Sequence, residues 1–371
     1  MTTILPGRPE TLTPDQEAKL KSFWKLLFEV CDGTAVGKFT QTKELKTILD
    51  RQTGDELRLA YWQAVKYDNP DALILRFLRA RKWDVEKAIT MMLTTIHWRS
   101  QTMHLEDIVK KGECLEDAGF MHQLRAGKSY IHGRDKENRV VCYVPARLHK
   151  PSDQSAESLE QFTVWLMETT RIVHQESADT SCLVFDMTGF SVSNMDYNSV
   201  KFMAMCFEAH FPECLGVCLV HNAPWFFQGI WKVIKGWLDP VVASKVHFTS
   251  GASGLSKFID KKDIPKSLGG DENWTYQYVE PVPGENSALI NPTPQQIEEK
   301  LKLEQVRSML ISDYEGMTLK WIKEEGNRSQ EERDRLRGEL KANYWMLDKY
   351  MRARTFYDRI GMIGEGGKVK L

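Results

Sequence analysis

Three segments between Thr180 and Thr249 decide the fold of this chain: TSCLVFD (residues 180–186), FPECLGVCLVHNAPWFFQGIWKVIKGWLDP (residues 211–240) and VVASKVHFT (residues 241–249). The middle segment contains 18 residues, 214–231, without an acidic or basic side chain. That length reaches the lower limit for spanning a bilayer. His221, Asn222 and Pro224 interrupt it, however, and divide it into a buried strand at residues 215–220 and a helix that begins near Pro224, where a proline is tolerated.

The helix that follows Pro224 carries more apolar surface than one core-facing stripe requires. Its apolar side chains are Trp225, Phe226, Phe227, Ile230, Trp231, Val233, Ile234 and Trp237. A helix that is apolar around most of its circumference needs apolar surroundings on more than one side. In a chain without a membrane span, this pattern favours a protein that handles lipid.

The composition excludes a bulk electrostatic function. The 371 residues carry a net charge of −1 with 27% charged residues, so neither nucleic acid nor an anionic membrane is expected to bind through overall charge. The seven cysteines lack a CxxC spacing and are interpreted as reduced, small apolar residues. The N-terminus shows no signal peptide pattern. We therefore expect a cytoplasmic protein whose membrane contact is peripheral.

The first part of the chain is predicted to be helical. Residues 14–30 place Leu20, Trp24 and Leu27 on one helical face, Asn69-Pro70 begins a second helix, and Asp84 caps a third. From residue 128 the pattern changes to strands (128–133, 139–148, 180–186, 215–220, 246–249) that alternate with helices (155–175, 196–210, 225–238). This alternation predicts an α/β fold with a mostly parallel sheet.

The chain after residue 270 begins with a linker rich in Pro, Gly and Asn and ends in a charged helical part that starts at Thr293-Pro294. Ser329 and Glu332 have the spacing of a capping box for the last long helix. The final part is interpreted either as a solvated helix packed on the body or as a partner-binding or membrane-binding element. The expected domains are a helical lobe (1–117), an α/β lobe (118–280) and a linker with a helical extension (281–371).

No catalytic constellation can be assembled from the sequence. Ser191 in GFSVS lacks the second glycine of a nucleophile elbow, and the nine histidines show no metal-ligand spacing. His221, at the end of a predicted strand, is the one histidine positioned for chemistry, and a structural role accounts for it more simply. We therefore expect no enzyme activity, no cofactor and no metal site.

These segments resemble the CRAL-TRIO lipid-binding family, and within it the fungal phosphatidylinositol transfer proteins. The motifs that carry the resemblance are LRFLRARKWDVEKA (75–88), GRDKENRVV (133–141), CLVFDMTGFS (182–191), FPECLG (211–216), NAPWFFQGIWKVIKGWLDPVVASK (222–245) and IPKSLGG (264–270). The resemblance implies a helical N-terminal lobe, followed by an α/β lobe whose sheet floors an apolar cavity closed by a movable helix. That gate would be the helix at residues 225–238.

The resemblance also implies a headgroup site for phosphatidylinositol. The family's arginine and lysine fall on Arg81 and Lys82, its glutamate on Glu213 and its final lysine on Lys245. Cationic donors and an acceptor suit a phosphodiester and a sugar ring. The family's threonine is replaced by Val242, which removes one headgroup hydrogen bond. A structural salt bridge between Glu213 and Lys245 is the alternative for that pair.

Most of the cavity residues that the family uses for phosphatidylcholine are replaced in this chain. Ser181 matches the family's cavity serine, but its threonine becomes Leu183 and its two tyrosines fall on Ile131 and Cys142. A more apolar second ligand, such as a sterol, squalene or another isoprenoid, therefore fits better than phosphatidylcholine.

The sequence thus predicts a protein that binds phosphatidylinositol and exchanges it between membranes together with a second hydrophobic lipid. Its partners would be these lipids and, transiently, a membrane surface, with no nucleic acid. The alternative is a sensor or scaffold that does not transfer lipid and presents phosphatidylinositol to a lipid kinase. A haem-binding function would require a tyrosine or histidine poised at the cavity.

Overall fold

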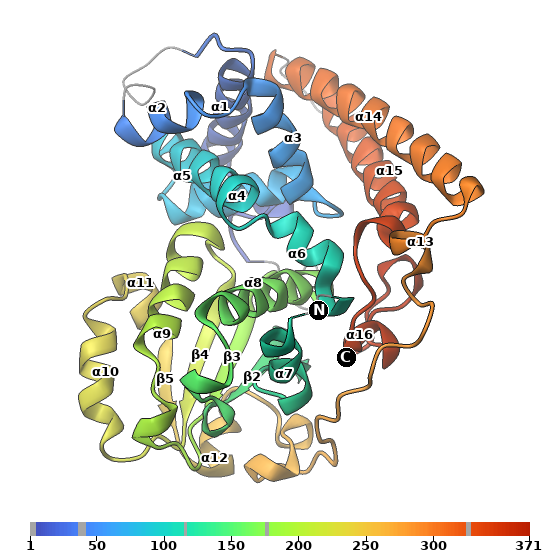
Figure 1. The fold of residues 1–371 in the computed structure, drawn as a ribbon. Helices are drawn as coiled ribbons and strands as arrows, with labels where there is room; N and C mark the ends of the chain where they lie inside the picture. Colours follow the sequence, from blue (N-terminus) through green and yellow to red (C-terminus); the bar gives the residue numbers. More distant parts are fainter. Residues whose placement is uncertain (1–4, 36–41, 115–116, 175–177, 324–327) are drawn as a thin grey trace.

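A computed structural model describes residues 5–35, 42–114, 117–174, 178–323 and 328–371. A helical lobe formed by the N-terminal part of the chain lies above an α/β lobe, a long helical hairpin from the C-terminal part lies beside the helical lobe, and the chain around α16 lies beside the α/β lobe (Figure 1). The α/β class with helical regions on either side of it in the sequence confirms the predicted fold class.

The helical lobe is built from short helices whose starts are set by local capping. Thr13, Asn69 and Asp84 each accept a backbone N–H of the helix that follows them, which satisfies donors that the first turn leaves unpaired. The helices are α1 (Pro14–Cys31), α2 (Lys43–Leu49), α3 (Gly54–Val65), α4 (Pro70–Ala80), α5 (Val85–His97) and α6 (Leu105–Lys111). α7 (Ala118–Ala126) follows and packs in the core of the α/β lobe.

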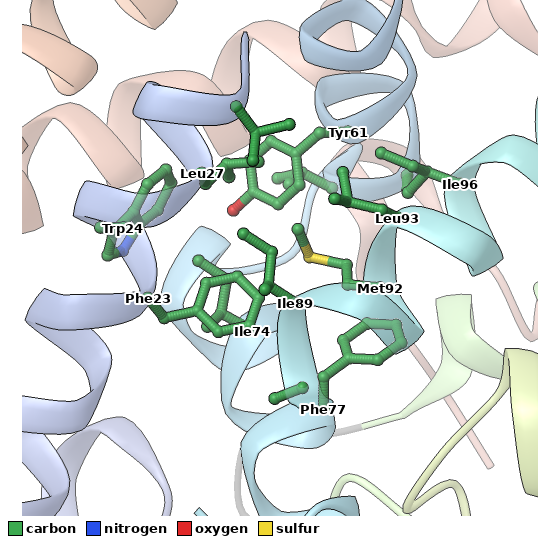
Figure 2. Packing of buried hydrophobic residues seen from close by; sticks show 14 of the residues in the cluster. Phe23, Trp24, Leu27, Tyr61, Ile74, Phe77, Ile89, Met92, Leu93 and Ile96 are labelled. Carbon is green, nitrogen blue, oxygen red and sulfur yellow. The ribbon is translucent and has the colours of Figure 1, made fainter. Parts of the chain in front are cut away.

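The core of this lobe lies where α1, α3, α4 and α5 meet. Figure 2 shows its centre, in which Trp24, Tyr61, Ile74, Ile89 and Leu93 from these helices point toward one another. Each of these five side chains is buried. The lobe is therefore held by apolar packing, and the predicted starts of three of its helices are confirmed within about one residue.

A five-stranded sheet organises the α/β lobe, with its strands in sequence order across the sheet. The strands are β1 (Tyr130–Arg134), β2 (Val140–Pro145), β3 (Ser181–Asp186), β4 (Leu215–His221) and β5 (Val246–Thr249). β1 pairs with β2 antiparallel, and the other three pairings are parallel. The connections between the parallel strands contain α8 (Ala156–Val173), α9 (Tyr197–Met205) with the π-helical turn η8 (Cys206–His210), α10 (Phe227–Lys235) and α11 (Pro240–Ser244).

The two faces of the sheet have different neighbours. On one face, Val141, Val184 and Leu219 pack against Leu255 and Ile259, in and just after α12 (Gly251–Leu255). The other face is turned toward α8, α9 and α10. Because successive side chains of a strand alternate between faces, each central strand supplies both a packed face and the face considered below.

The C-terminal part packs on both lobes. It comprises α13 (Ser287–Ile290), α14 (Pro294–Lys323), α15 (Arg328–Met351) and α16 (Phe356–Arg359), and α14 and α15 form the hairpin at the right of Figure 1. Tyr314 and Trp321 enter the core of the helical lobe, whereas Tyr344 and Phe356 enter the core of the α/β lobe. The extension therefore packs on the rest of the protein, as the first of the two interpretations of the sequence predicts.

A buried ion cluster joins the helical lobe to α8. Glu168 of α8 contacts Lys66 at 2.9 Å, Arg99 at 2.9 Å and Arg171 at 3.0 Å. Burial alone would raise the pKa of the Glu168 carboxyl, but the three cations hold it well below its usual range. α8 lies between the two lobes. Its buried carboxylate and the three cationic partners therefore hold the lobes in their relative position.

Some helix boundaries differ from the sequence predictions, among them the end of the aromatic helix, which is Lys235 rather than residue 238. The aromatic helix begins at Phe227 rather than near Pro224, because Pro224, Trp225 and Phe226 form a turn closed by the Phe227 N–H and the Pro224 carbonyl at 2.9 Å. α15 begins at Arg328, so Ser329 lies inside the helix, and its predicted role as the N-cap is wrong. Over the part of the chain that the structure describes, no helix has the length and apolar character needed to cross a membrane.

Candidate ligand cavity and headgroup site

A cavity of about 290 Å³ lies between the sheet and the helices α8, α9 and α10. Its walls are almost entirely apolar, with Leu166 and Met167 from α8, Met203 from α9 and Phe185 and Val220 from the strands. A concave, apolar space of this kind is where a protein takes up an apolar molecule.

The strand register places one row of side chains across the floor of this cavity. Cys142 of β2 pairs with Leu183 of β3, Leu183 with Cys218 of β4, and Cys218 with Val246 of β5. All four line the cavity. Three of the four predicted cavity residues, Cys142, Ser181 and Leu183, therefore lie on the wall.

The fourth predicted cavity residue, Ile131, is next in the row of paired strand residues but does not line the cavity. It pairs with Cys142 across β1 and β2, yet its side chain is fully buried in the core beside the C-terminal extension. The backbone N–H of Ile131 donates to the hydroxyl of Tyr357 at 3.0 Å. The extension thus covers β1 at the position where the family resemblance places a cavity tyrosine.

The cysteines of the floor are inert apolar groups. All seven cysteines are free thiols. Burial raises the pKa of Cys142 and of Cys218 to about 12, so neither is a thiolate near neutral pH. They act as small wall residues, in agreement with the sequence interpretation.

A hydrogen-bonded pair lies on the wall next to the predicted cavity residues. The Nε2 atom of His174 lies 2.8 Å from the Ser181 hydroxyl, and both residues line the cavity. Burial, followed by the nearby charge of Arg76, lowers the pKa of His174 to about 3. The ring is therefore neutral at physiological pH, and Ser181 already has a partner within the protein. Sequence reasoning did not identify His174, because nothing in its local pattern marks it.

The aromatic helix α10 forms the wall at the β5 side of the sheet, at the left edge of Figure 1. Phe227, Trp231 and Ile234 line the cavity. This one-sided arrangement follows from their spacing of three and four residues, which places them on one helical face.

The other residues predicted for the gate lie around that inner face. Phe226 stacks on Phe190, and Ile230 packs partly buried in the same cluster. Trp237 contacts Tyr197 and lies beneath the ammonium of Lys201, and Trp225 points outward with 87% of its surface exposed. One end of α10 thus presents a large exposed indole while its inner face closes the cavity.

Arg81 and Lys82 follow α4 directly. Arg81 is the C-cap residue of α4 and lines a surface groove together with Thr90 and Ala209. Lys82 is exposed and has a φ of 51°, in the left-handed region that non-glycine residues rarely adopt. Such backbone strain concentrates at functional sites.

Glu213 lies just before β4, and Lys245 lies between α11 and β5 with its ammonium at the start of β4. Glu213 also has a positive φ, 57°, and its carbonyl accepts a hydrogen bond from Arg76 at 3.1 Å. The Lys245 ammonium donates to the carbonyl of Leu215 at 2.8 Å. Among the described residues no ion pair joins Glu213 to Lys245, so the structural salt bridge considered as an alternative is absent.

The four predicted headgroup residues form two pairs: Arg81 and Lys82 follow α4, whereas Glu213 precedes β4 and the Lys245 ammonium reaches the first residue of β4. Ala209, four residues before Glu213, lines the same groove as Arg81. Val242, which replaces the family's threonine, lines the cavity with an apolar surface. The assignment of these four residues to a headgroup stays a prediction.

A buried cluster behind this region was not predicted. Asp179 lies 2.7 Å from Arg8, 3.4 Å from Arg79 and 3.5 Å from Arg76. Burial opposes ionisation of Asp179, but the arginines outweigh it and hold the pKa of this carboxyl well below its usual range. Because Arg76 also holds the Glu213 carbonyl, the cluster fixes the backbone from which Glu213 projects.

The residues considered for catalysis are engaged elsewhere. The Ser191 hydroxyl bonds to Ser193 and Asn194 in an exposed turn, and the ring of His221 bonds to the Thr249 hydroxyl. No group of three or more His, Cys, Asp or Glu side chains suited to a metal ion occurs within the described ranges. The geometry therefore offers a container for an apolar molecule.

Comparison with known proteins agrees with this geometry. The sequence model of the CRAL/TRIO domain matches residues 124–270, and that of the CRAL/TRIO N-terminal domain matches residues 41–93. The chain is 37% identical to the phosphatidylinositol transfer protein CSR1 of Eremothecium gossypii, with 97% of this chain and 99% of the relative covered. It is 47% identical to a CRAL-TRIO domain-containing protein of Schizosaccharomyces pombe, over 88% of this chain and 73% of the relative.

The fold has a counterpart among solved structures. The crystal structure of Sfh5 superposes with a TM-score of 0.52 at 16% sequence identity, covering 79% of this chain and 96% of that one. At this identity the likeness concerns the fold alone. Two family models match the chain in order, and relatives are similar over nearly its whole length. This protein therefore belongs to the CRAL-TRIO family, in the branch of its fungal phosphatidylinositol transfer proteins.

Proposed function

We propose that the chain binds phosphatidylinositol and exchanges it between membranes, and that it carries a second, more apolar lipid in the same cavity. The observation that supports this most is the apolar cavity whose β5-side wall is the inner face of α10. The phosphatidylinositol transfer protein among its relatives favours the same function.

The physical need for such a cavity follows from the cost of moving a lipid through water. At about 0.8 kcal/mol per methylene, a diacyl lipid with roughly 30 methylenes leaves a bilayer at a cost of about 25 kcal/mol. A protein lowers this barrier only by offering an apolar space that opens while it is docked on the membrane. The exposed indole of Trp225, at the end of α10, is suited to the interface between headgroups and acyl chains.

The choice of the second lipid rests on the floor of the cavity. The row formed by Cys142, Leu183, Cys218 and Val246 offers no free hydrogen-bonding group to a choline headgroup. Ser181, the one hydroxyl that matches the family's pattern, is paired with His174. A sterol, squalene or another isoprenoid therefore fits this floor better than phosphatidylcholine.

We propose for the same reasons that the protein is a carrier rather than an enzyme, and that it works in the cytoplasm in transient contact with membranes. The division into a helical lobe (1–117), an α/β lobe (118–280) and an extension (281–371) is also proposed, with the extension contributing to both cores rather than folding alone.

The test is mass spectrometry of the lipids that the protein retains after incubation with a eukaryotic lipid extract, comparing wild type with Lys245→Ala. The loss of a charge-assisted hydrogen bond is expected to weaken phosphatidylinositol binding about tenfold to a hundredfold, while the apolar lipid stays bound. Lys257→Ala, an exposed lysine just after α12, is the matched control and is expected to behave as wild type.

Two outcomes would change this conclusion. If wild type retained no phosphatidylinositol, the headgroup site would be wrong and the protein would be a carrier of the apolar lipid alone. If it retained phosphatidylinositol but did not move it between vesicles, the sensor or scaffold that presents this lipid to a lipid kinase would be the better description.

A further inference from the structure

The two ends of the aromatic helix α10 are held in different ways. At its N-terminal end, Phe227 is buried and packs edge-to-face against Phe190 of the loop after β3, with the ring centroids 5.8 Å apart. Phe226 stacks on the same ring at 6.3 Å. Beyond the C-terminal end, by contrast, Trp237 keeps 37% of its surface exposed. The connection that follows α10 is therefore the less buried of the two.

One stripe of side chains on α9 and the following turn η8 contacts this connection. Tyr197, Lys201 and Glu208 are four and seven residues apart, a spacing that places them on one helical face. The ring of Tyr197 meets the Trp237 indole edge-to-face at 5.6 Å, and the Lys201 ammonium lies 4.6 Å from the centre of that indole. The Glu208 carboxylate accepts the backbone N–H of Asp239 at 2.5 Å. The three side chains thus join α9 and η8 to the segment between α10 and α11.

These contacts bridge two walls of the cavity. α9 and α10 stand next to each other at the left of Figure 1, and each lines the cavity, α9 with Met203 and α10 with Trp231 and Ile234. Asp239 is the N-cap of α11, so Glu208 holds the chain between α10 and α11. A displacement of the C-terminal end of α10 away from α9 would therefore break all three contacts.

The strength of these contacts suits a closure that opens and forms again. A cation over an exposed indole, an aromatic pair and one charge-assisted hydrogen bond each change an equilibrium by a factor of about two to ten. Together they favour the closed form by about a hundredfold, which leaves the open form as a minor state of the size that ligands can select.

We propose that Tyr197, Lys201 and Glu208 form a latch that holds the C-terminal end of α10 against α9 and sets how often the cavity opens. This rests on the proposal that α10 closes the cavity. None of the three residues lines the cavity. Glu208 is a positioning residue, because it acts through the backbone at Asp239. Loss of the latch would expose the cavity floor without unfolding the sheet.

Two cysteines on opposite faces of the sheet report this opening without any lipid. Cys218 lies on the cavity floor, whereas Cys182 packs on the other face of the sheet with Leu255 and Ile259. A thiol must be accessible and deprotonated to react, and burial raises the pKa of both thiols. Of the two, opening of α10 exposes Cys218, and global unfolding exposes both. Their alkylation by N-ethylmaleimide is followed by mass spectrometry on the full chain.

In Glu208→Ala, Cys218 is expected to be alkylated about fivefold to tenfold faster than in wild type, because the N–H of Asp239 loses its acceptor and the open state becomes more populated. Glu208→Gln keeps an acceptor oxygen, so the rate is expected to stay within about twofold of wild type. Cys182 is expected to keep its wild-type rate in both variants.

Lys201→Met removes the cation over Trp237 and is expected to raise the rate at Cys218 about threefold. It decides the proposal if Glu208→Ala fails to fold. Glu157→Ala is the matched control, because this exposed carboxylate belongs to another wall helix, α8, and pairs with Gln161 of that same helix. Its rate at Cys218 is expected to equal that of wild type.

An unchanged rate at Cys218 in Glu208→Ala and Lys201→Met would overturn the proposal. An equal acceleration at Cys182 would overturn it as well, since that would assign the effect to global stability. Phosphatidylinositol exchange between vesicles, measured in parallel, separates these results from the proposed function. Exchange by a protein whose Cys218 is indifferent to Glu208 contradicts the latch alone, whereas the expected alkylation pattern without exchange supports the latch and contradicts the proposed function.

Discussion

His174 shows what a single residue on the cavity wall contributes to the behaviour of the protein. Its ring is bonded to Ser181 and stays neutral in the folded state because its pKa falls to about 3. In the unfolded chain a histidine takes up a proton below about pH 6.5. The unfolded state therefore binds more protons, and the free energy of unfolding falls as the pH is lowered from 6.5 toward 3.

The variant His174→Gln is expected to reduce this pH dependence. At pH 5 the contribution of one such histidine amounts to at most about 2 kcal/mol of lost stability, and glutamine keeps a partner for Ser181 without titrating. Urea unfolding at pH 7 and at pH 5 measures the difference. His210, whose pKa burial lowers to about 4, contributes equally to the pH dependence of unfolding in both proteins. An identical loss in wild type and variant would show that His174 is protonated in the folded state.

At the scale of elements, α10 combines two surfaces. Its inner face lines the cavity with Phe227, Trp231 and Ile234, and the turn before it exposes Trp225. Trp231→Asp is expected to leave the fold largely intact but to reduce lipid transfer at least about tenfold, because a carboxylate on an apolar wall is unfavourable whenever the cavity is closed over a lipid.

The measurement is transfer of labelled phosphatidylinositol between vesicles, with circular dichroism to confirm folding. Gln228→Asp places the same charge on the exposed side of α10 and serves as the control. Transfer by Trp231→Asp at the wild-type rate would mean that α10 does not close the cavity.

The elements also show where sequence reasoning succeeds and where it stops. The starts of α1, α4 and α5 follow from Thr13, Asn69 and Asp84, because a cap acts within its own first turn. The start of α10 was misplaced because Pro224 fits a turn as well as a first helical turn, and the sequence does not distinguish them.

The candidate site divides in the same way. Cys142, Ser181 and Leu183 could be placed on the cavity wall because the family resemblance locates them. The buried amide of Gln123 could not be predicted, because its Nε2 atom donates to the backbone carbonyl of Ser158, 35 residues away. The position of Ile131 likewise depends on Tyr357, 226 residues away.

At the scale of the whole molecule, the C-terminal hairpin is attached through a buried arginine. The side chain of Arg333 is fully buried and donates to Asp71 of α4 at 2.7 Å, to the Tyr314 hydroxyl at 2.9 Å and to Thr318 at 3.0 Å. Asp71 also accepts from the indole of Trp24 at 2.7 Å. This network connects α15 with the centre of the helical lobe.

Arg333→Ala is expected to lower the free energy of unfolding by about 3–5 kcal/mol, because it leaves the Asp71 carboxylate buried without its cation. Arg335→Ala is the matched control: the side chain of Arg335 is 54% exposed and pairs with Glu332 on the surface, so its loss is expected to cost at most about 1 kcal/mol. Equal midpoints of urea unfolding for the two variants would mean that the hairpin is only loosely attached to the helical lobe.

The contact between Tyr357 and Ile131 has a consequence for the behaviour of the protein in solution. β1 is an edge strand, and an edge strand with free N–H groups is a template on which another chain can add a strand. The Tyr357 hydroxyl accepts a hydrogen bond from one of these N–H groups, that of Ile131. The rings of Tyr276 and Trp274 lie against the ring of the adjacent Tyr130. Tyr357 of the C-terminal extension, together with these two residues of the α/β lobe, therefore protects the sheet against self-association, and a chain shortened before Tyr357 is expected to aggregate even where its cavity is intact.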